Sequence, residues 1–311
     1  MYVMKIVHQF GSDGESYNED TDKVTKIKIS KCDNFLFTGD VSGRIVIFRK
    51  RKVLKIEIWE PMYQYIGATP KLDYLTGEQV DNRVVDIISF QYNERYIYNM
   101  VADTKNIYLH KIHSQVKNEQ TTSTVFNISG KTKTTNKRDY TDCHKYYINS
   151  IGHSKCYDYI YSADDLNINM WNIERPNMAM PVIDNVPNDF STLTSTITKM
   201  KLSPLKENII YTSSSNGIVS TFDTRQKCIT TDPVSMFYSS KMASYDSAEH
   251  VKGNIFKKRS NVQLQFISDI DISPDAQYIV TRSPLFINVW DTRNTLNPCH
   301  YFPIHKHIYP P

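Results

Sequence analysis

Few residues in this chain have the types and spacing that enzyme chemistry requires. The closest histidine groupings are His110 with His113 and His305 with His307, and neither has further ligands at zinc spacing. The 5 cysteines are widely spaced and form no C-x-x-C pair. The chain also has no G-x-S-x-G or H-E-x-x-H motif and no glycine-rich phosphate loop. We therefore expect a protein that is not an enzyme and that uses no metal or other cofactor.

An acidic pair, Asp164 and Asp165, lies in the segment Tyr161-Ser162-Ala163-Asp164-Asp165-Leu166. Carboxylates at such a corner can cap a turn through backbone N–H groups, or they can meet a cationic partner. We expect turn capping for one of the two. For the other, a role in recognition stays open.

The elements that must position these residues form a repeat. Each copy has an alternating apolar and polar strand, a turn, an apolar strand, a polar corner and a third strand that ends in Trp, Phe or His. The five copies are Val24 to Phe48, Val84 to His110, Ile148 to Trp171, Ile197 to Phe222 and Ile267 to Trp290. Endings such as Trp290-Asp291 are typical of WD40 repeats, in which about 40 to 45 residues form one four-stranded blade. The repeat predicts an all-β, WD40-type β-propeller that occupies residues 1–311 as one domain.

Long insertions separate the copies, and binding residues are often found in such loops. The insertion from Gln115 to Asp142 has β-forming residues on both sides of Gly130. This pattern predicts a hairpin arm that projects beyond its blade, with an irregular loop as the alternative.

Charge and composition argue against several classes of partner. Lys and Arg total 37 and Asp and Glu total 33, so the formal net charge is only +4. The densest basic stretches, Lys131 to Arg138 and Lys257 to Arg259, lie in polar segments between modules. We therefore expect neither a nucleic-acid nor a membrane partner. The odd number of cysteines and the lack of a signal peptide predict a protein of the cytoplasm or nucleus.

Several segments, in order along the chain, resemble the B-family WD-propeller regulatory subunit of protein phosphatase 2A. The longest is Tyr161-Ser162-Ala163-Asp164-Asp165-Leu166-x-Ile168-Asn169-x-Trp171. The others include Thr38-Gly39-Asp40-x-x-Gly43-Arg44, Asp73-Tyr74-Leu75, Tyr146-x-Ile148-Asn149-Ser150, Asp223-x-Arg225 and Trp290-Asp291. Generic WD repeats would not reproduce the Ser-Ala-Asp-Asp and Asp-Tyr-Leu segments.

The resemblance implies a seven-bladed, non-catalytic subunit that binds the helical-repeat scaffold and the catalytic subunit of the phosphatase and recruits phosphoprotein substrates. It implies substrate-binding roles for Tyr146, Asp164, Asp165, Leu193 and Thr196. In the family the arm grips the scaffold, which implies scaffold-binding roles for Gln115, Lys117, Val125, Phe126, Ile128, Lys131 and Lys133.

The chain departs from the family in two ways. Leu193 is retained, but Ser and Thr replace the acidic residues that flank it in the family, so we expect weaker electrostatic recruitment of basic substrates. Only five modules are visible, which predicts an open ring or a ring closed by fewer blades. A WD-repeat scaffold of another intracellular assembly, or a truncated remnant without phosphatase binding, is the alternative function.

Overall fold

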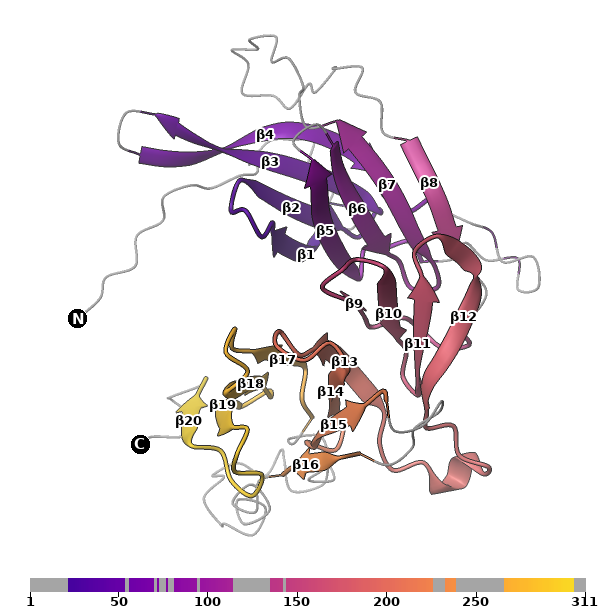
Figure 1. The fold of residues 1–311 in the computed structure, drawn as a ribbon, viewed down its shortest axis with the longest axis vertical. Coiled ribbons are helices and arrows are strands. Elements are labelled where there is room, and N and C mark those ends of the chain that lie inside the picture. Colours follow the sequence, from indigo (N-terminus) through magenta and orange to yellow (C-terminus); the bar gives the residue numbers. More distant parts are fainter. Residues whose placement is uncertain are drawn as a thin grey trace. The chain divides into compact units, whose positions relative to one another are not determined.

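The computed structural model describes residues 22–53, 56–69, 72, 77, 81–93, 96–113, 135–141, 144–225, 233–238 and 266–304. In this described part the chain forms five four-stranded antiparallel sheets (Figure 1). The chain divides into two compact units, Met1–Asp142 and Cys143–Pro311. The five-bladed β-propeller arrangement that the repeat predicts is confirmed, with one sheet for each copy.

The first unit contains two of the sheets. Each is a meander in which every strand pairs with the next one along the chain. The strands are β1 (Val24–Ile29), β2 (Phe35–Asp40), β3 (Arg44–Val53) and β4 (Ile56–Ile66), then β5 (Asp86–Asn93), β6 (Tyr96–Ala102), β7 (Ile107–His113) and β8 (Thr135–Tyr140).

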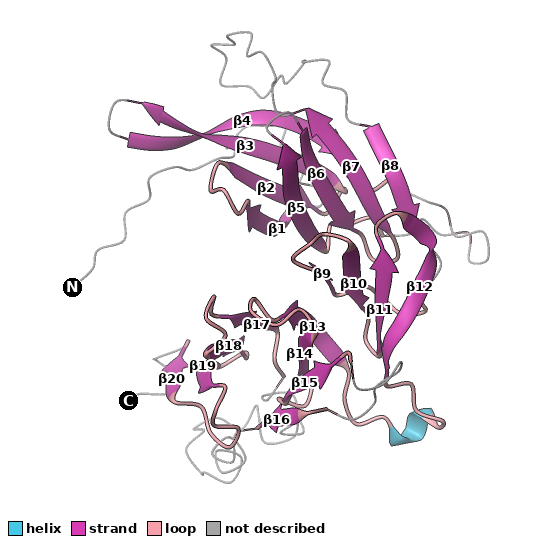
Figure 2. Cartoon of the chain, viewed as in Figure 1, coloured by secondary structure: helices cyan, strands magenta, loops and turns pink. Residues whose placement is uncertain are grey.

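The second unit contains three sheets of the same meander order, which lie to the C-terminal side of the first two in the chain. Figure 2 shows that strands dominate this unit as well, and that a short 3-10 helix, η1 (Phe190–Thr192), lies between two of the sheets in the chain. The strands are β9 (Ser150–His153), β10 (Tyr159–Ala163), β11 (Asn167–Asn172) and β12 (Arg175–Asp184), then β13 (Ile197–Leu202), β14 (Ile209–Ser214), β15 (Val219–Asp223) and β16 (Ser235–Phe237), then β17 (Asp269–Ile272), β18 (Tyr278–Arg282), β19 (Phe286–Asp291) and β20 (His300–Pro303).

In the first four sheets the fourth strand comes from a segment that the repeat assigns to an insertion, and in the last sheet it follows the last copy. This corrects the predicted arm at 115–142, because β8 pairs with β7 from Ile107 with Tyr140 to Lys111 with Thr135. The last part of the predicted arm therefore completes the second sheet and does not project from it. A fourth strand satisfies the backbone groups along the outer edge of β7, which three strands alone would leave unpaired. The rest of the predicted arm, 115–134, lies outside the described residues.

The core of each unit lies between successive sheets. In the first unit, Phe37, Ile45 and Tyr65 pack in one cluster with Val84 and Ile87 of the next sheet. The second unit has two such clusters, one between its first and second sheets and one between its second and third. Alternation along each strand sends apolar side chains to these faces, which is why the repeat is visible in the sequence.

Among the described residues, no helix has both the length and the apolar character that crossing a membrane requires.

Candidate protein-interaction site

The corner between β10 and β11 is organised by a fully buried carboxylate. Asp164 is 0 % exposed, and its Oδ1 accepts hydrogen bonds from the backbone N–H groups of Leu166 at 2.8 Å and Asn167 at 2.6 Å. Its Oδ2 lies 2.8 Å from Nδ1 of His144. Capping of this kind explains why an aspartate occupies a corner whose backbone donors would otherwise be buried without partners.

His144 extends these contacts into the core of the sheet. Its Nε2 lies 2.6 Å from Oγ of Ser162, and Nε1 of Trp171 donates to the same Oγ at 2.7 Å. A neutral imidazole that donates from Nδ1 to Asp164 and accepts at Nε2 from the Ser162 hydroxyl satisfies all four side chains. The network therefore ties the third strand of the sheet to its corner.

The network also fixes the ionisation of Asp164. Burial opposes the charged form, but the hydrogen bonds from His144, Asn167 and Leu166 outweigh it and hold the pKa of Asp164 below its ordinary value. The carboxyl group is thus an ionised structural acceptor at neutral pH.

The predicted substrate-binding role of Asp164 is therefore wrong at the level of direct contact, because a carboxylate with no exposed surface cannot reach a partner. Asp164 instead caps the turn, which is the other role that the sequence analysis considered for the acidic pair. Asp165 is the half-buried member of the pair, and its backbone carbonyl accepts a hydrogen bond from Ile197 N at 2.7 Å. The corner is in this way fastened to the first strand of the next sheet.

The segment that precedes β13 is shaped by its own hydroxyl and carboxylate groups. Asp189 caps η1, since Ser191 donates to it from the backbone N at 2.9 Å and from Oγ at 2.7 Å. These two bonds hold the pKa of Asp189 below its ordinary value. Leu193 follows the helix and is 37 % exposed. A capped turn therefore presents an apolar side chain at the surface.

Thr196 anchors the other end of this segment. Its backbone N donates to Oγ of Ser215 at 2.9 Å, and its carbonyl accepts from the backbone N of Ser215 at 2.9 Å. Ser215 lies in the corner between β14 and β15. The Leu193 segment is thus held against that corner at a fixed position.

A groove of about 450 Å³ lies between this segment and β14 to β16. Hydroxyl and apolar side chains dominate its lining, and Asp184 supplies a negative charge. The hydroxyl-bearing lining residues are Thr192, Thr194, Ser195, Thr196, Thr212, Ser214 and Ser220, and the apolar ones include Val186, Leu193, Ile218 and Met236. Such a surface suits a partner segment with apolar side chains and hydrogen-bonding groups more than a highly basic one.

Known proteins resemble the chain along almost its whole length. No protein-family model matches it. The regulatory B subunit of protein phosphatase PP2A from Schizosaccharomyces pombe is 24 % identical over 97 % of the chain. The chain is similar to regulatory B subunits of protein phosphatase 2A. The corresponding protein of Candida tropicalis is 25 % identical over 96 % of the chain, and the beta isoform of the 55 kDa regulatory B subunit from Sus scrofa is 25 % identical over 98 %.

The chain is shorter than these regulatory B subunits. It spans 68 % of the Schizosaccharomyces pombe protein, 61 % of the Candida tropicalis protein and 72 % of the Sus scrofa protein. The similarity confirms the resemblance drawn from the sequence motifs, together with the shorter length. Because these relatives are regulatory subunits of a phosphatase, the similarity supports a regulatory rather than a catalytic role.

The structure brings together some of the residues for which the resemblance to phosphatase regulators implies substrate binding, but not all of them. Leu193 and Thr196 line the groove. Tyr146 is half-buried before β9, and neither it nor Asp165 is part of the groove lining. Leu193 and Thr196 are therefore the predicted residues best placed to contact a partner in the groove.

The residues predicted to bind the scaffold lie outside the described residues. They are Gln115, Lys117, Val125, Phe126, Ile128, Lys131 and Lys133.

The groove also contains residues that sequence reasoning missed. Thr212, Ser214 and Ser220 lie on β14 and β15, and Asp184 ends β12. The sequence predicts binding residues in insertions and corners, whereas these residues belong to strands. Their signal was the run of hydroxyl residues Thr212-Ser213-Ser214, which is unusual in an otherwise apolar second strand. Within the described ranges, no group of three or more His, Cys, Asp or Glu residues is placed to hold a metal ion.

Proposed function

We propose that the chain is a non-catalytic regulatory subunit of a protein phosphatase 2A complex, which binds the scaffold and catalytic subunits and recruits phosphoprotein substrates. The observation that carries the proposal is similarity to regulatory B subunits over 97 % of the chain, on a five-sheet propeller arrangement. The WD40-type sheets supply a rigid frame, and a regulatory subunit needs surfaces rather than a reaction centre.

In this proposal the groove beside Leu193 is the surface that receives substrate segments. Leu193 is an exposed apolar anchor, and the hydroxyl groups around it can pair with the backbone of a bound segment. Asp165 and Tyr146 would contribute only to a substrate that extends beyond the groove. With hydroxyl groups next to Leu193, selectivity rests on shape and hydrogen bonding more than on net charge.

Scaffold binding is proposed for the segment 115–134, which precedes β8. The position of β8 decides how this can be tested, because removal of 115–142 would also remove the fourth strand of the second sheet. Replacing 115–134 by a short Gly-Ser linker leaves β7 and β8 in place. We expect this variant to stay folded and to lose the scaffold subunit.

Co-purification tests the proposed function. The tagged chain is expressed with the scaffold and catalytic subunits of protein phosphatase 2A, and we expect recovery of a complex that contains all three. The linker variant of 115–134 is the matched control for specificity. Folded, soluble chain that recovers neither subunit would contradict the proposal, and its recovery with a different, reproducible set of proteins would favour a WD-repeat scaffold of another assembly.

A further inference from the structure

The hairpin formed by β3 and β4 reaches beyond the other strands of its sheet (Figure 1). β2 pairs with β3 as far as Arg49, and the backbone N of Lys50 donates to the Asn34 carbonyl at 2.8 Å. β3 continues to Val53, which pairs with Ile56 of β4. In the described part of the chain, the end of β3 therefore has a neighbouring strand on one side only.

The backbone of β3 faces an edge here that no described strand covers. Every second residue of a strand points its N–H and C=O groups to the same side, so Lys52 faces the side on which Lys50 donates to Asn34. An uncovered edge is a template for another extended segment, which binds through main-chain hydrogen bonds. The hairpin thus offers backbone pairing to an extended peptide.

Four consecutive cations, Arg49 to Lys52, occupy the same part of β3. They are the longest uninterrupted run of Lys and Arg in the chain. Arg49, Arg51 and Lys52 are exposed, and Lys50 is half-buried. Sequence reasoning missed the run because it lies within a strand and not in an insertion. The edge that an incoming segment would meet is therefore strongly basic.

The hairpin neutralises only part of this positive charge. Lys50 pairs with Glu57 at 2.6 Å and Arg51 pairs with Glu60 at 3.2 Å, whereas Arg49 forms no ion pair with another residue of the described ranges. Four cations and two carboxylates leave these parts of β3 and β4 with an excess of positive charge. Exposed ion pairs contribute little stability, so both pairs can give way to carboxylates of a partner.

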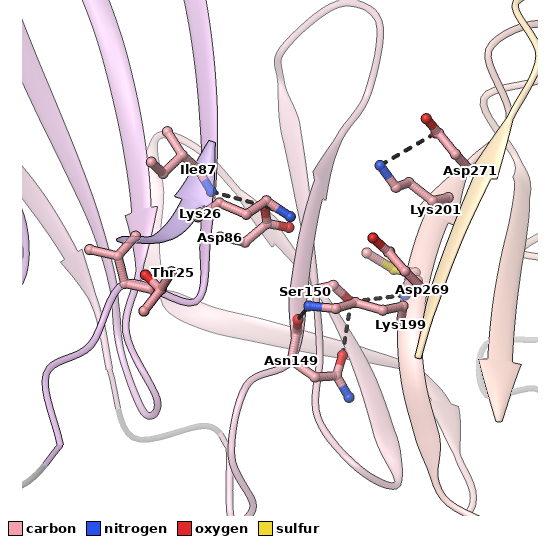
Figure 3. Close-up of polar contacts among 12 residues, drawn as sticks. Thr25, Lys26, Asp86, Ile87, Asn149, Ser150, Lys199, Lys201, Asp269 and Asp271 are labelled. Carbon is pink, nitrogen blue, oxygen red and sulfur yellow. Dashed lines mark hydrogen bonds and ion pairs between the residues drawn. The ribbon is translucent and has the colours of Figure 1, made fainter. Parts of the chain in front are cut away.

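Cations on other strands are neutralised by the neighbouring sheet. Lys26 of β1 pairs with Asp86 of β5 at 2.9 Å, and Lys201 of β13 pairs with Asp271 of β17 at 3.5 Å; Figure 3 shows the residues of both pairs. Each pair joins successive sheets within one unit, so these lysines serve the fold. The cations of the hairpin differ, because their carboxylate partners lie on the hairpin itself and are too few.

A pocket of about 360 Å³ lies beside the basic run. All four cations line it, together with Glu60, Pro61 and Met62 of β4. Guanidinium groups bind carboxylates through paired hydrogen bonds, and the apolar side chains can contact the aliphatic part of an acidic side chain. The pocket therefore suits Asp or Glu side chains of a bound segment.

We propose that the β3–β4 hairpin binds an extended, acidic segment of a partner protein along the edge of β3. The segment pairs with the backbone of β3 and places carboxylates against Arg49 and Arg51. A nucleic acid suits this surface less well, because its phosphate backbone cannot add a strand and would meet Glu57 and Glu60. The hairpin belongs to the first unit, and the proposal does not depend on the groove beside Leu193 in the second unit.

Fluorescence anisotropy of a labelled peptide tests the proposal on the full chain. The probe alternates Glu and Thr, which places its carboxylates on one side of an extended strand. We expect binding that weakens as the salt concentration rises, and roughly tenfold weaker binding of the matched peptide with Gln in place of Glu. A wild-type chain that does not bind the acidic peptide, as would follow if a segment of its own occupied the edge, would overturn the proposal.

Variants of the hairpin locate the binding. Arg49→Gln combined with Arg51→Gln should weaken it by roughly tenfold. Arg175→Gln combined with Arg282→Gln removes the same charge from exposed positions in the second unit and should bind as the wild type does, and equal losses for the two double variants would overturn the proposal. Glu60→Gln removes a competing carboxylate and should tighten binding. It also decides the question if the first double variant fails to fold, as judged by circular dichroism, because unchanged or weaker binding would contradict the proposed site.

Two further ligands separate strand pairing from attraction by charge alone. A peptide of the same sequence with methylated backbone nitrogens keeps its charge but loses the donors that pair with β3, so we expect clearly weaker binding. A single-stranded oligodeoxynucleotide of equal charge should also bind more weakly than the acidic peptide. Undiminished binding of the methylated peptide would overturn strand pairing, and tighter binding of the oligodeoxynucleotide would assign the hairpin to nucleic acid instead.

Discussion

His144 Nδ1 lies 2.8 Å from the carboxylate of Asp164, with side chains that are 1 % and 0 % exposed. This pair joins a loop residue before β9 to the corner after β10, and through Ser162 it reaches Trp171 of β11. The acidic corner that first suggested a recognition site is therefore an internal clamp. In the proposed function, substrate recognition belongs to the partly exposed groove beside Leu193.

Asp164→Asn should destabilise the second unit. The amide accepts at one atom only, so part of the set of donors from His144, Leu166 and Asn167 is left buried without a partner. We expect a loss of about 1–3 kcal/mol in the free energy of unfolding, measured by urea denaturation. Asp165→Asn, at the half-buried neighbour, is the matched control and should cost less. Equal losses for the two variants would contradict the clamp.

His110 should make stability depend on pH. Burial lowers the pKa of His110 below its ordinary value, in part offset by the hydrogen bond between its Nε2 and the Gly67 carbonyl at 2.8 Å. The unfolded chain then binds a proton at a higher pH than the folded chain does. Stability should therefore be fully present above the ordinary value of about 6.5 and fall as the pH drops below it.

Denaturation curves of wild type and His110→Phe between pH 7.5 and pH 5 test this dependence. Phenylalanine matches the aromatic residue that ends the third strand in other copies, such as Phe48 and Phe222, but cannot titrate. The variant should lose part of the slope of stability against pH. An unchanged slope would mean that His110 is not its source.

Gly43→Ala should be more damaging than an equivalent change at another glycine with positive φ. Gly43 has φ +82°, and an added Cβ would lie 2.6 Å from the backbone carbonyl oxygen of Ala68. Gly77 has φ +71° but no atom within 4 Å of the same added group. We expect Gly77→Ala to cost about 1–2 kcal/mol from backbone conformation alone. Thermal unfolding should show a clearly larger loss for Gly43→Ala, and similar losses would rule out the close contact as the cause.

Leu193→Ala should weaken substrate capture without affecting folding. Truncation removes the exposed apolar anchor of the groove, which corresponds to about 1–2 kcal/mol, or roughly a 5- to 30-fold loss of affinity. The measurement is the rate at which the assembled phosphatase complex dephosphorylates a co-purifying phosphoprotein. Leu205→Ala, at a leucine that is 56 % exposed outside the groove, is the matched control. Equal effects of the two variants would place the substrate site elsewhere.

Sequence reasoning found the strands because their side chains alternate, and it found the family resemblance because short segments such as Ser162-Ala163-Asp164-Asp165 occur in the right order. It assigned β8 to an arm because Thr135–Tyr140 has no apolar pattern. β8 is an edge strand that is held by backbone hydrogen bonds to β7. Backbone pairing of this kind imposes little pattern on the side chains, so the sequence gives little indication of it.

The sequence by itself determined the fold class, the number of sheets and the relationship to phosphatase regulatory subunits. Periodicity and local motifs are properties of neighbouring residues, which is why they could be read without coordinates. Only the tertiary structure decided that Asp164 is buried while Leu193 is exposed, because burial depends on distant segments such as the one that carries His144.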